Sequence, residues 1–168
     1  MRKTVVLILV VFYVIYAKAD ILNDIIDGKF RAKTPASLRS MNDGENFTQI
    51  IDGKMIVKYN YKTGLAVDTL LNISNLVVSP ISYITGYSFS DDEKKMLIYS
   101  NPSYRYRRTF TAKYYVYDID TKKISSLSEN GEQEVPLFSP DSKSVVFARK
   151  NNLYLTNLEQ NKETQITF

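Results

Sequence analysis

The residues best suited to chemistry in this chain are the arginines and tyrosines of the run 104–108, Tyr-Arg-Tyr-Arg-Arg. An arginine side chain stays charged at any working pH and offers several fixed N–H donors, so it can bind a carbonyl oxygen or an anion. Arginines also stack on tyrosine rings in solvated loops. From the residues alone we favour a solvated loop for this run. For Arg105 and Arg108 we keep this interpretation.

Other catalytic groups are scarce. The 168 residues include no histidine and no cysteine, which excludes a Ser-His-Asp triad, a thiol nucleophile, an imidazole zinc ligand and an iron–sulfur cluster within this sequence. Ser90 and Ser139 stand in no nucleophile elbow. The run Asp91-Asp92-Glu93 could bind a metal through oxygen ligands, but the matching turn at 141–143 lacks the extra carboxylates, so a hairpin turn is favoured. We therefore expect no catalytic residue, metal site or cofactor in this chain.

The positive charge does not indicate a nucleic-acid partner. The formal net charge is +4, but Arg2, Lys3 and Lys18 lie within the first nineteen residues. Without them, 22 − 3 = 19 basic residues face 18 acidic ones. A nearly neutral body lacks the basic surface that phosphate backbones require, and we expect no nucleic-acid binding.

Residues 1–19 have the pattern of a secretory signal peptide. Arg2 and Lys3 precede an apolar run from Val5 to Tyr16, and Ala17-Lys18-Ala19 fits an A-x-A cleavage site. A helix of those residues is about 18 Å long, against about 30 Å for the hydrocarbon core of a bilayer. The sequence therefore predicts cleavage, export to the periplasm or the extracellular space, and no membrane span in the mature protein. An uncleaved N-terminal anchor is the alternative.

The mature chain is predicted to be almost entirely β-structure. Residues 20–35 hold one short helix and a lead-in, with Asp20 as the N-cap and Asp27-Gly28 as the stop. From 36 onward, short alternating apolar runs are separated by turn residues such as Lys62-Thr63-Gly64 and Asn130-Gly131. Many short strands at this spacing are typical of a sandwich, a barrel or a propeller.

An internal repeat favours the propeller. The stretch from Phe89, Phe-Ser-Asp-Asp-Glu-Lys-Lys-Met-Leu, returns from Phe138 as Phe-Ser-Pro-Asp-Ser-Lys-Ser-Val-Val, 49 residues later. A four-stranded unit at this period is the sequence mark of a propeller blade. We predict about three such blades, near residues 36–72, 83–128 and 134–167.

These residues resemble a known family. The run Tyr99–Ile119, the Phe-Ser-Pro-Asp turn at 138–141 and the stretch 151–155 are similar to the N-terminal propeller of dipeptidyl peptidase IV-type serine peptidases, in the prolyl oligopeptidase family. The segment from Ser37 to Gly64 resembles the first blade of bacterial members. The arginine-aromatic insertion before Thr111-Ala112 is the more specific signal, because many propellers carry the blade turn.

The resemblance implies that residues 36–168 are the first blades of an eight-bladed propeller, which is followed by an α/β-hydrolase domain. In such enzymes an arginine of the second blade hydrogen-bonds a substrate carbonyl. By resemblance Arg107 is that residue, with Tyr106 as a weaker substrate-binding candidate. The serine, acid and histidine of the triad lie in the hydrolase domain, so this chain contains none of them. Peptide substrates, the further blades, the hydrolase domain and, in the full-length form, a homodimer are the implied partners.

Two functions from different classes remain open at this stage. The first is a non-catalytic propeller segment of an exported peptidase that releases N-terminal X-Pro or X-Ala dipeptides. The second is a stand-alone β-propeller-like binding or scaffold module without peptidase activity. The DNA beyond codon 168 would distinguish them, because only the first predicts an acidic pair and a nucleophile elbow downstream.

Overall fold

The computed structural model describes residues 21–32, 37–76 and 78–168, which divide into an N-terminal unit ending at residue 36 and a unit running from Ser37 to Phe168. In the first unit residues 21–26 are helical and Gly28 adopts a φ of 73°, as the predicted helix and its stop require. The predicted signal segment, 1–19, lies outside the described residues. No helix in the described ranges is both long and apolar enough to cross a membrane.

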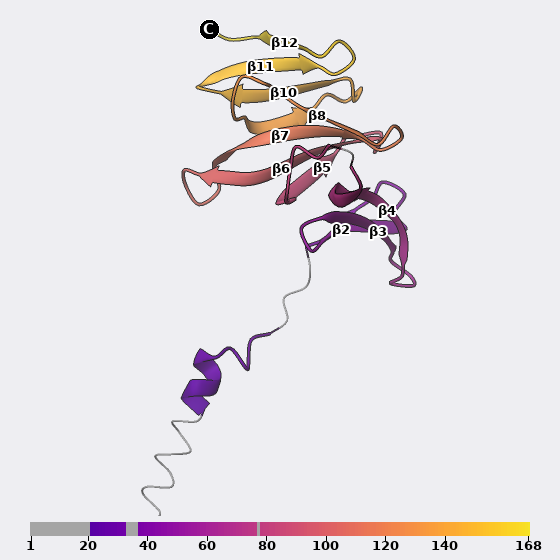
Figure 1. The fold of residues 1–168 in the computed structure, drawn as a ribbon, viewed down its shortest axis with the longest axis vertical. Helices are drawn as coiled ribbons and strands as arrows, with labels where there is room; N and C mark the ends of the chain where they lie inside the picture. Colours follow the sequence, from indigo (N-terminus) through magenta and orange to yellow (C-terminus); the bar gives the residue numbers. More distant parts are fainter. Residues whose placement is uncertain (1–20, 33–36, 77) are drawn as a thin grey trace, which may run out of the picture. The chain divides into compact units, whose positions relative to one another are not determined.

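The second unit consists of three four-stranded antiparallel sheets in which each strand pairs with the next along the chain (Figure 1). A single 3-10 turn, η1 (Ile73–Asn75), follows the first sheet. The strands are β1 (Arg39–Ser40), β2 (Asn46–Ile51), β3 (Met55–Asn60) and β4 (Ala66–Asn72); β5 (Gly86–Phe89), β6 (Lys95–Tyr104), β7 (Phe110–Asp118) and β8 (Lys123–Ser126); β9 (Glu134–Phe138), β10 (Ser144–Arg149), β11 (Asn152–Asn157) and β12 (Lys162–Gln165). The predicted all-β class and the three predicted blades are confirmed.

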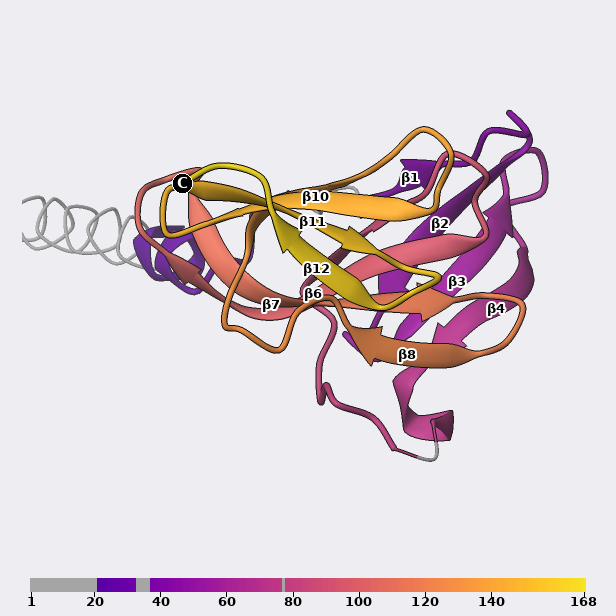
Figure 2. The same ribbon diagram turned by 90° about the horizontal axis from the view of Figure 1, so that it is seen from above.

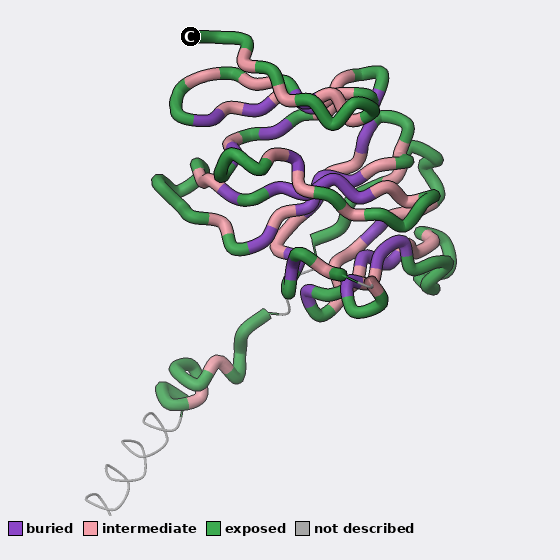
Figure 3. Tube along the Cα trace, turned by 45° about the horizontal axis from the view of Figure 1, so that its top comes forward, coloured by how far each residue is buried: buried purple, intermediate pink, exposed green. Residues whose placement is uncertain are grey.

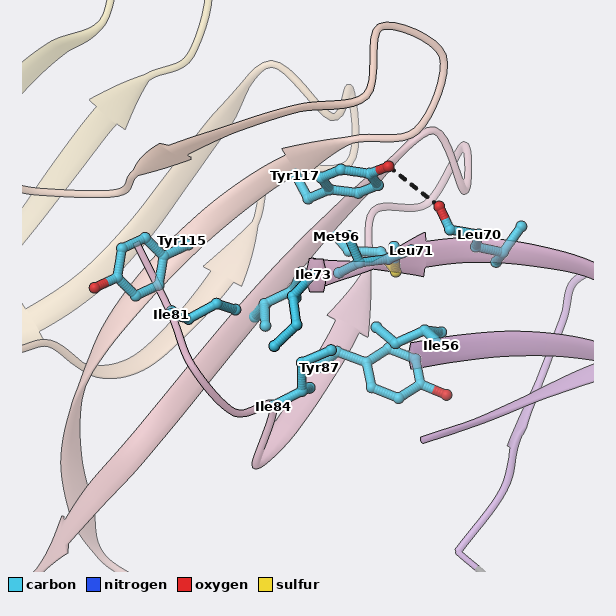
Figure 4. Packing of buried hydrophobic residues seen from close by; sticks show 11 residues of the cluster. Ile56, Leu70, Leu71, Ile73, Ile81, Ile84, Tyr87, Met96, Tyr115 and Tyr117 are labelled. Carbon is cyan, nitrogen blue, oxygen red and sulfur yellow. Dashed lines mark hydrogen bonds between the residues drawn. The ribbon is translucent and has the colours of Figure 1, made fainter. Parts of the chain in front are cut away.

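The sheets stack in chain order (Figures 1 and 2). Two apolar cores hold them together. Burial follows the middle strands, while the turns are exposed (Figure 3). Between the first two sheets, Ile56 and Leu71 pack against Met96 (Figure 4). The hydroxyl of Tyr117 donates to the carbonyl of Leu70 at 3.2 Å across this interface. A buried tyrosine therefore packs its ring in the core and still satisfies its polar atom.

A second polar contact crosses the same interface. The hydroxyls of Thr48 and Tyr87 lie 2.6 Å apart, and the two residues are 0% and 4% exposed. Between the second and third sheets the core includes Leu97, Val145 and Phe147. Each sheet thus buries one face against its neighbour, which is how blades stabilise one another in a propeller.

Alternation of side chains along β10 shows why these sequences form strands with two different faces. Val145 and Phe147 point into the core, whereas Val146 lies on the opposite side, paired with Leu137 of β9 and Leu155 of β11. We call Leu137, Val146, Leu153 and Leu155 the outer face of the third sheet. Leu137, Leu153 and Leu155 are 59%, 44% and 36% exposed, so this face is apolar and open within residues 37–168.

The 49-residue repeat corresponds to a repeated hairpin turn. The hydroxyls of Ser90 and Ser139 donate to Asp92 and Asp141 at 2.6 and 2.5 Å. In both copies the backbone N–H five residues after the serine donates back to its hydroxyl at 3.0 Å. These hydroxyl bonds are the main cause that lowers the pKa of each aspartate below its usual range. The run 91–93 is therefore a hairpin turn, as the sequence indicated.

The first sheet carries the same turn in a form that sequence comparison missed. Asp43 precedes Asp92 by 49 residues, the same interval that separates Asp92 from Asp141. Its carboxylate accepts the side-chain amide of Asn46 at 2.7 Å and the backbone N–H of Glu45 at 2.9 Å, and these bonds hold its pKa well below the usual range. The three turns therefore begin at equivalent points of three equivalent blades.

Candidate functional site

An extended hairpin of the second sheet carries the arginine-rich run. Strands β6 and β7 are ten and nine residues long and remain paired as far as Tyr104 and Phe110, well past the ends of β5 and β8. The register shifts between Ser100 and Ser103, where Asn101 adopts a φ of 49°. A bulge of this kind bends and twists a strand pair and often lies beside a binding site. The hairpin tip spans residues 105–109.

Aromatic rings support the base of this hairpin. Phe110 lies 5.1 Å from Tyr99 and 5.4 Å from Tyr104, measured between ring centroids. Tyr99 in turn lies 5.2 Å from Tyr114. Each tilted pair adds about 0.5–1.5 kcal/mol beyond its buried area. Burial raises the pKa of both Tyr99 and Tyr114, so these hydroxyls stay protonated at neutral pH.

The hairpin is also attached to the segment leading into the third sheet. Ala112 and Gln133 exchange two backbone hydrogen bonds of 3.1 and 2.8 Å. The fully buried Gln133 side chain accepts the backbone N–H of Tyr114 at 2.9 Å, and the Thr111 hydroxyl donates to the Glu132 carboxylate. An amide enclosed in this way fixes the backbone on both sides of it. The arm therefore has a defined position relative to both sheets.

The predicted site residues lie at the tip of this arm. Arg105, Tyr106, Arg107 and Arg108 are all exposed, and 74% of Tyr106 is accessible to solvent. The backbone N–H of Arg105 donates to the carbonyl of Thr109 at 2.9 Å, which closes the tip. Arg107 is thus available to a ligand, and its role as a carbonyl contact stays a prediction.

Arg108, next to it in the chain, lines a cavity of about 320 Å³ that the sequence did not indicate. We call this the first-strand cavity, because the first strand of every sheet contributes to its wall. Arg39 comes from β1, Tyr87 and Ser88 from β5, and Val135 and Pro136 from β9.

The remaining wall comes from the β6–β7 arm, through Leu97, Tyr99, Thr109, Phe110 and Tyr114. The guanidinium carbon of Arg39 lies 5.3 Å from the centroid of the Tyr87 ring, so it faces an aromatic surface. None of the residues lining the cavity is acidic. The cavity therefore combines aromatic walls with two positive charges.

Sequence reasoning had one signal that leads to these residues. Arg39 and Ser88 stand four residues before the repeated aspartates Asp43 and Asp92, and Val135 stands six before Asp141. Counting back from the repeated aspartates therefore locates the first strand of each sheet, and these strands share the cavity wall. The repeat in its first copy is disguised, because Asp43 lacks the preceding Phe-Ser pair.

Among the described residues no group of three or more acidic side chains could hold a metal ion. The hydroxyls of Ser90 and Ser139 are used in the hairpin turns, where each donates to a turn aspartate and accepts a backbone N–H. The arm and the first-strand cavity can bind and position a ligand through guanidinium and aromatic groups.

Comparison with known proteins identifies a consistent set of relatives. Residues 90–168 match the family model described as the dipeptidyl peptidase IV (DPP IV) N-terminal region. A probable dipeptidyl-aminopeptidase B of Emericella nidulans is 40% identical over 81 residues, which are 46% of this chain and 9% of the relative. That of Aspergillus fumigatus is 35% identical over 102 residues, which are 55% of this chain and 11% of the relative. The chain thus spans about a tenth of the length of these curated relatives.

A solved structure extends the likeness over most of the chain. The crystal structure of Porphyromonas gingivalis dipeptidyl peptidase 4 superposes with a TM-score of 0.79 and 34% sequence identity. The match covers 87% of this chain and 21% of that one. The three sheets are therefore arranged as in part of a larger protein.

Proposed function

We propose that residues 37–168 form an N-terminal propeller segment of the dipeptidyl peptidase IV type, and that the chain is the non-catalytic front of an exported serine exopeptidase that releases N-terminal X-Pro or X-Ala dipeptides. The observation that supports this most is the long β6–β7 arm, whose arginine-rich tip lies within the region that matches the family model. Further blades and an α/β-hydrolase domain would supply the rest of the chamber and the catalytic triad.

In this proposal the segment recognises substrate and does not transform it. The guanidinium of Arg107 donates to a substrate carbonyl, with Tyr106 beside it as a secondary contact. The rings of Tyr99, Tyr104 and Phe110 stiffen the arm, so that the guanidinium reaches the substrate from a fixed base. Preorganisation of this kind reduces the entropy lost on binding.

The proposal is tested first by comparing this chain with the longer protein. We expect the full-length protein to hydrolyse a Gly-Pro chromogenic substrate, with a serine-directed inhibitor abolishing the reaction, and the 168-residue chain to be inactive. The DNA beyond codon 168 should encode, in frame, an acidic Glu-Glu pair and then a Gly-Trp-Ser-Tyr-Gly-Gly-like elbow. A reading frame without either would contradict the peptidase and favour a binding module.

Arg107→Ala in the full-length protein tests the residue assignment. Loss of one charge-assisted hydrogen bond costs about 1.5–3 kcal/mol, which lowers kcat/KM roughly 10- to 150-fold. Arg105→Ala is the matched control, because it removes the same group from the same exposed tip. Equal activities for both variants would return Arg107 to the solvated-loop interpretation.

Export is tested separately. We expect the mature protein to begin near Asp20, after removal of residues 1–19, and to be found in the periplasm or the medium. N-terminal sequencing of the purified protein measures this. A protein that retains residue 1 and pellets with membranes would support the anchored alternative.

A further inference from the structure

Two arginines far apart in the sequence line the first-strand cavity together. The proposed contact between Arg107 and a substrate carbonyl does not require them. Arg39 belongs to the first sheet and Arg108 to the arm of the second. Its volume of about 320 Å³ is at the lower end of the range for small-molecule sites, roughly 300–1,000 Å³. The cavity is therefore large enough for a small group, and its shape depends on how the three sheets pack.

Among the residues that the structure describes, the two guanidinium groups have no counterion. No acidic residue lines the cavity, and in the part of the chain that the structure describes no carboxylate lies within salt-bridge distance of Arg39 or Arg108. An anion that entered would meet positive charge without displacing an existing ion pair. Arginine binds carboxylates with two parallel hydrogen bonds, which makes a carboxylate the best-matched ligand.

The rest of the wall is aromatic. Tyr87, Tyr99, Phe110 and Tyr114 line the cavity, and burial keeps the hydroxyls of Tyr87, Tyr99 and Tyr114 protonated by raising their pKa. Rings of this kind favour an apolar body over a bare, hydrated ion. The chemistry thus asks for a carboxylate attached to an apolar or aromatic group.

The backbone provides an independent sign. Val135 lines the cavity with a φ of 47° and is 69% exposed. A β-branched residue in the left-handed region is strained, and such strain is concentrated at binding and active sites. The strand is irregular here, because the pairing of β9 with β10 shifts between Val146 and Ala148. The bulge places an unfavourable residue at the cavity wall.

We propose that the first-strand cavity is a second recognition site, which binds a carboxylate of a peptide, either an acidic side chain or the C-terminal group, with Arg39 and Arg108 on the anion and the four rings around its apolar part. The site deepens the proposed function, since it would select peptides through a group other than the carbonyl that Arg107 contacts. Its own binding does not depend on catalysis.

The test uses the 168-residue chain and two matched probes, N-acetyl-phenylalanine and its neutral amide, in a buffer free of phosphate and sulfate. Isothermal titration or NMR shift titration measures the two dissociation constants. We expect the carboxylate to bind at least tenfold more tightly than the amide. Acetate is the third probe, and we expect it to bind more weakly than N-acetyl-phenylalanine because it lacks the apolar body.

Variants assign the effect to the cavity. Arg39→Ala and Arg108→Ala should each abolish the preference for the carboxylate, Arg39→Lys should retain part of it, and Arg105→Ala, at the same exposed tip but outside the cavity wall, should leave it unchanged. Far-UV circular dichroism checks folding, which we expect to be preserved because these arginines are exposed.

Three results would overturn the proposal: equal or undetectable binding of acid and amide, acetate binding as tightly as N-acetyl-phenylalanine, or loss of the preference in Arg105→Ala with retention in Arg39→Ala. Because no result depends on hydrolysis, failure here is distinct from failure of the proposed peptidase function.

Discussion

The ion pair between Arg149 and Glu163 gives a quantitative test of how the third sheet is held. Arg149 is 9% exposed, and its guanidinium donates to the two oxygens of Glu163 at 2.5 and 3.2 Å. The same group stacks 3.9 Å from the centroid of the Tyr154 ring and donates to the Ser128 hydroxyl at 2.8 Å. This pairing raises the pKa of Arg149 and lowers that of Glu163, so both stay charged at neutral pH.

Removing either partner leaves a charge in a nearly buried position. Loss of one member of a buried pair costs about 3–5 kcal/mol. Because 10% and 16% of the Arg149 and Glu163 side chains remain exposed, we expect a cost just below that range, about 2.5 kcal/mol. Arg149→Met and Glu163→Leu should each lower Tm by roughly 5–10 °C. The double variant should lose less than the sum of the two, because apolar groups then replace both charges.

The assay is thermal and urea unfolding followed by circular dichroism, with Leu137→Lys and Leu155→Lys introduced in every variant to make the outer face of the third sheet polar. Lys143 and Glu159 are the matched control pair, since their bridge of 3.1 Å is 58% and 64% exposed and should contribute less than about 1 kcal/mol. The reasoning would be refuted if Arg149→Met and Glu163→Leu each lowered the free energy of unfolding by less than about 0.5 kcal/mol and the two losses added up in the double variant. Solvent would then screen the pair.

Three further outcomes follow from the described unit. Residues 37–168 should self-associate in light scattering through the outer face of the third sheet, and the variant carrying Leu137→Lys and Leu155→Lys should scatter as a monomer; a monodisperse parent would contradict this. Stability should fall as pH drops below about 4, because the folded-state pKa of Asp141 is lowered: its contribution is fully present above its unfolded pKa and is lost as the pH falls through the lowered folded-state pKa. Asp141→Asn should flatten the dependence of Tm on pH in that range. Gly53→Ala should destabilise far more than Gly44→Ala, although both have positive φ, because only the first would place a Cβ 1.8 Å from a tyrosine ring; equal melting temperatures would exclude the clash.

The blade boundaries were predictable because the repeat and the turn residues are local signals. The pair Ser139 and Asp141 forms a turn through bonds within six residues, so its chemistry is legible in one short stretch. The same applies to the alternation of β10. The Asp43 turn was missed because Asn46, instead of a serine, donates to the aspartate. The sequence therefore differs, while the turn geometry is kept.

The pairing of distant residues could not be predicted from the sequence. Alternation places Arg149 on the inner face with Val145 and Phe147, but its partner Glu163 is set by the registers of β10 with β11 and β11 with β12. Gln133 likewise closes the arm only because the chain returns to β7 before β9 begins. Such contacts depend on how strands distant in the sequence pair, and a single sequence does not reveal that pairing.

The first-strand cavity could not be predicted either, because three sheets contribute to its wall. Its wall takes Arg39 from one sheet, Tyr87 from the next and Val135 from the third, so no single blade contains the site. The shape of the cavity depends on the contacts between sheets, including the buried Thr48–Tyr87 hydroxyl pair at 2.6 Å. Tyr87 has a place in both, since its ring faces Arg39 and its hydroxyl bonds to Thr48. A substitution that loosens the interface between the first two sheets should therefore alter ligand recognition in the cavity before it unfolds either sheet.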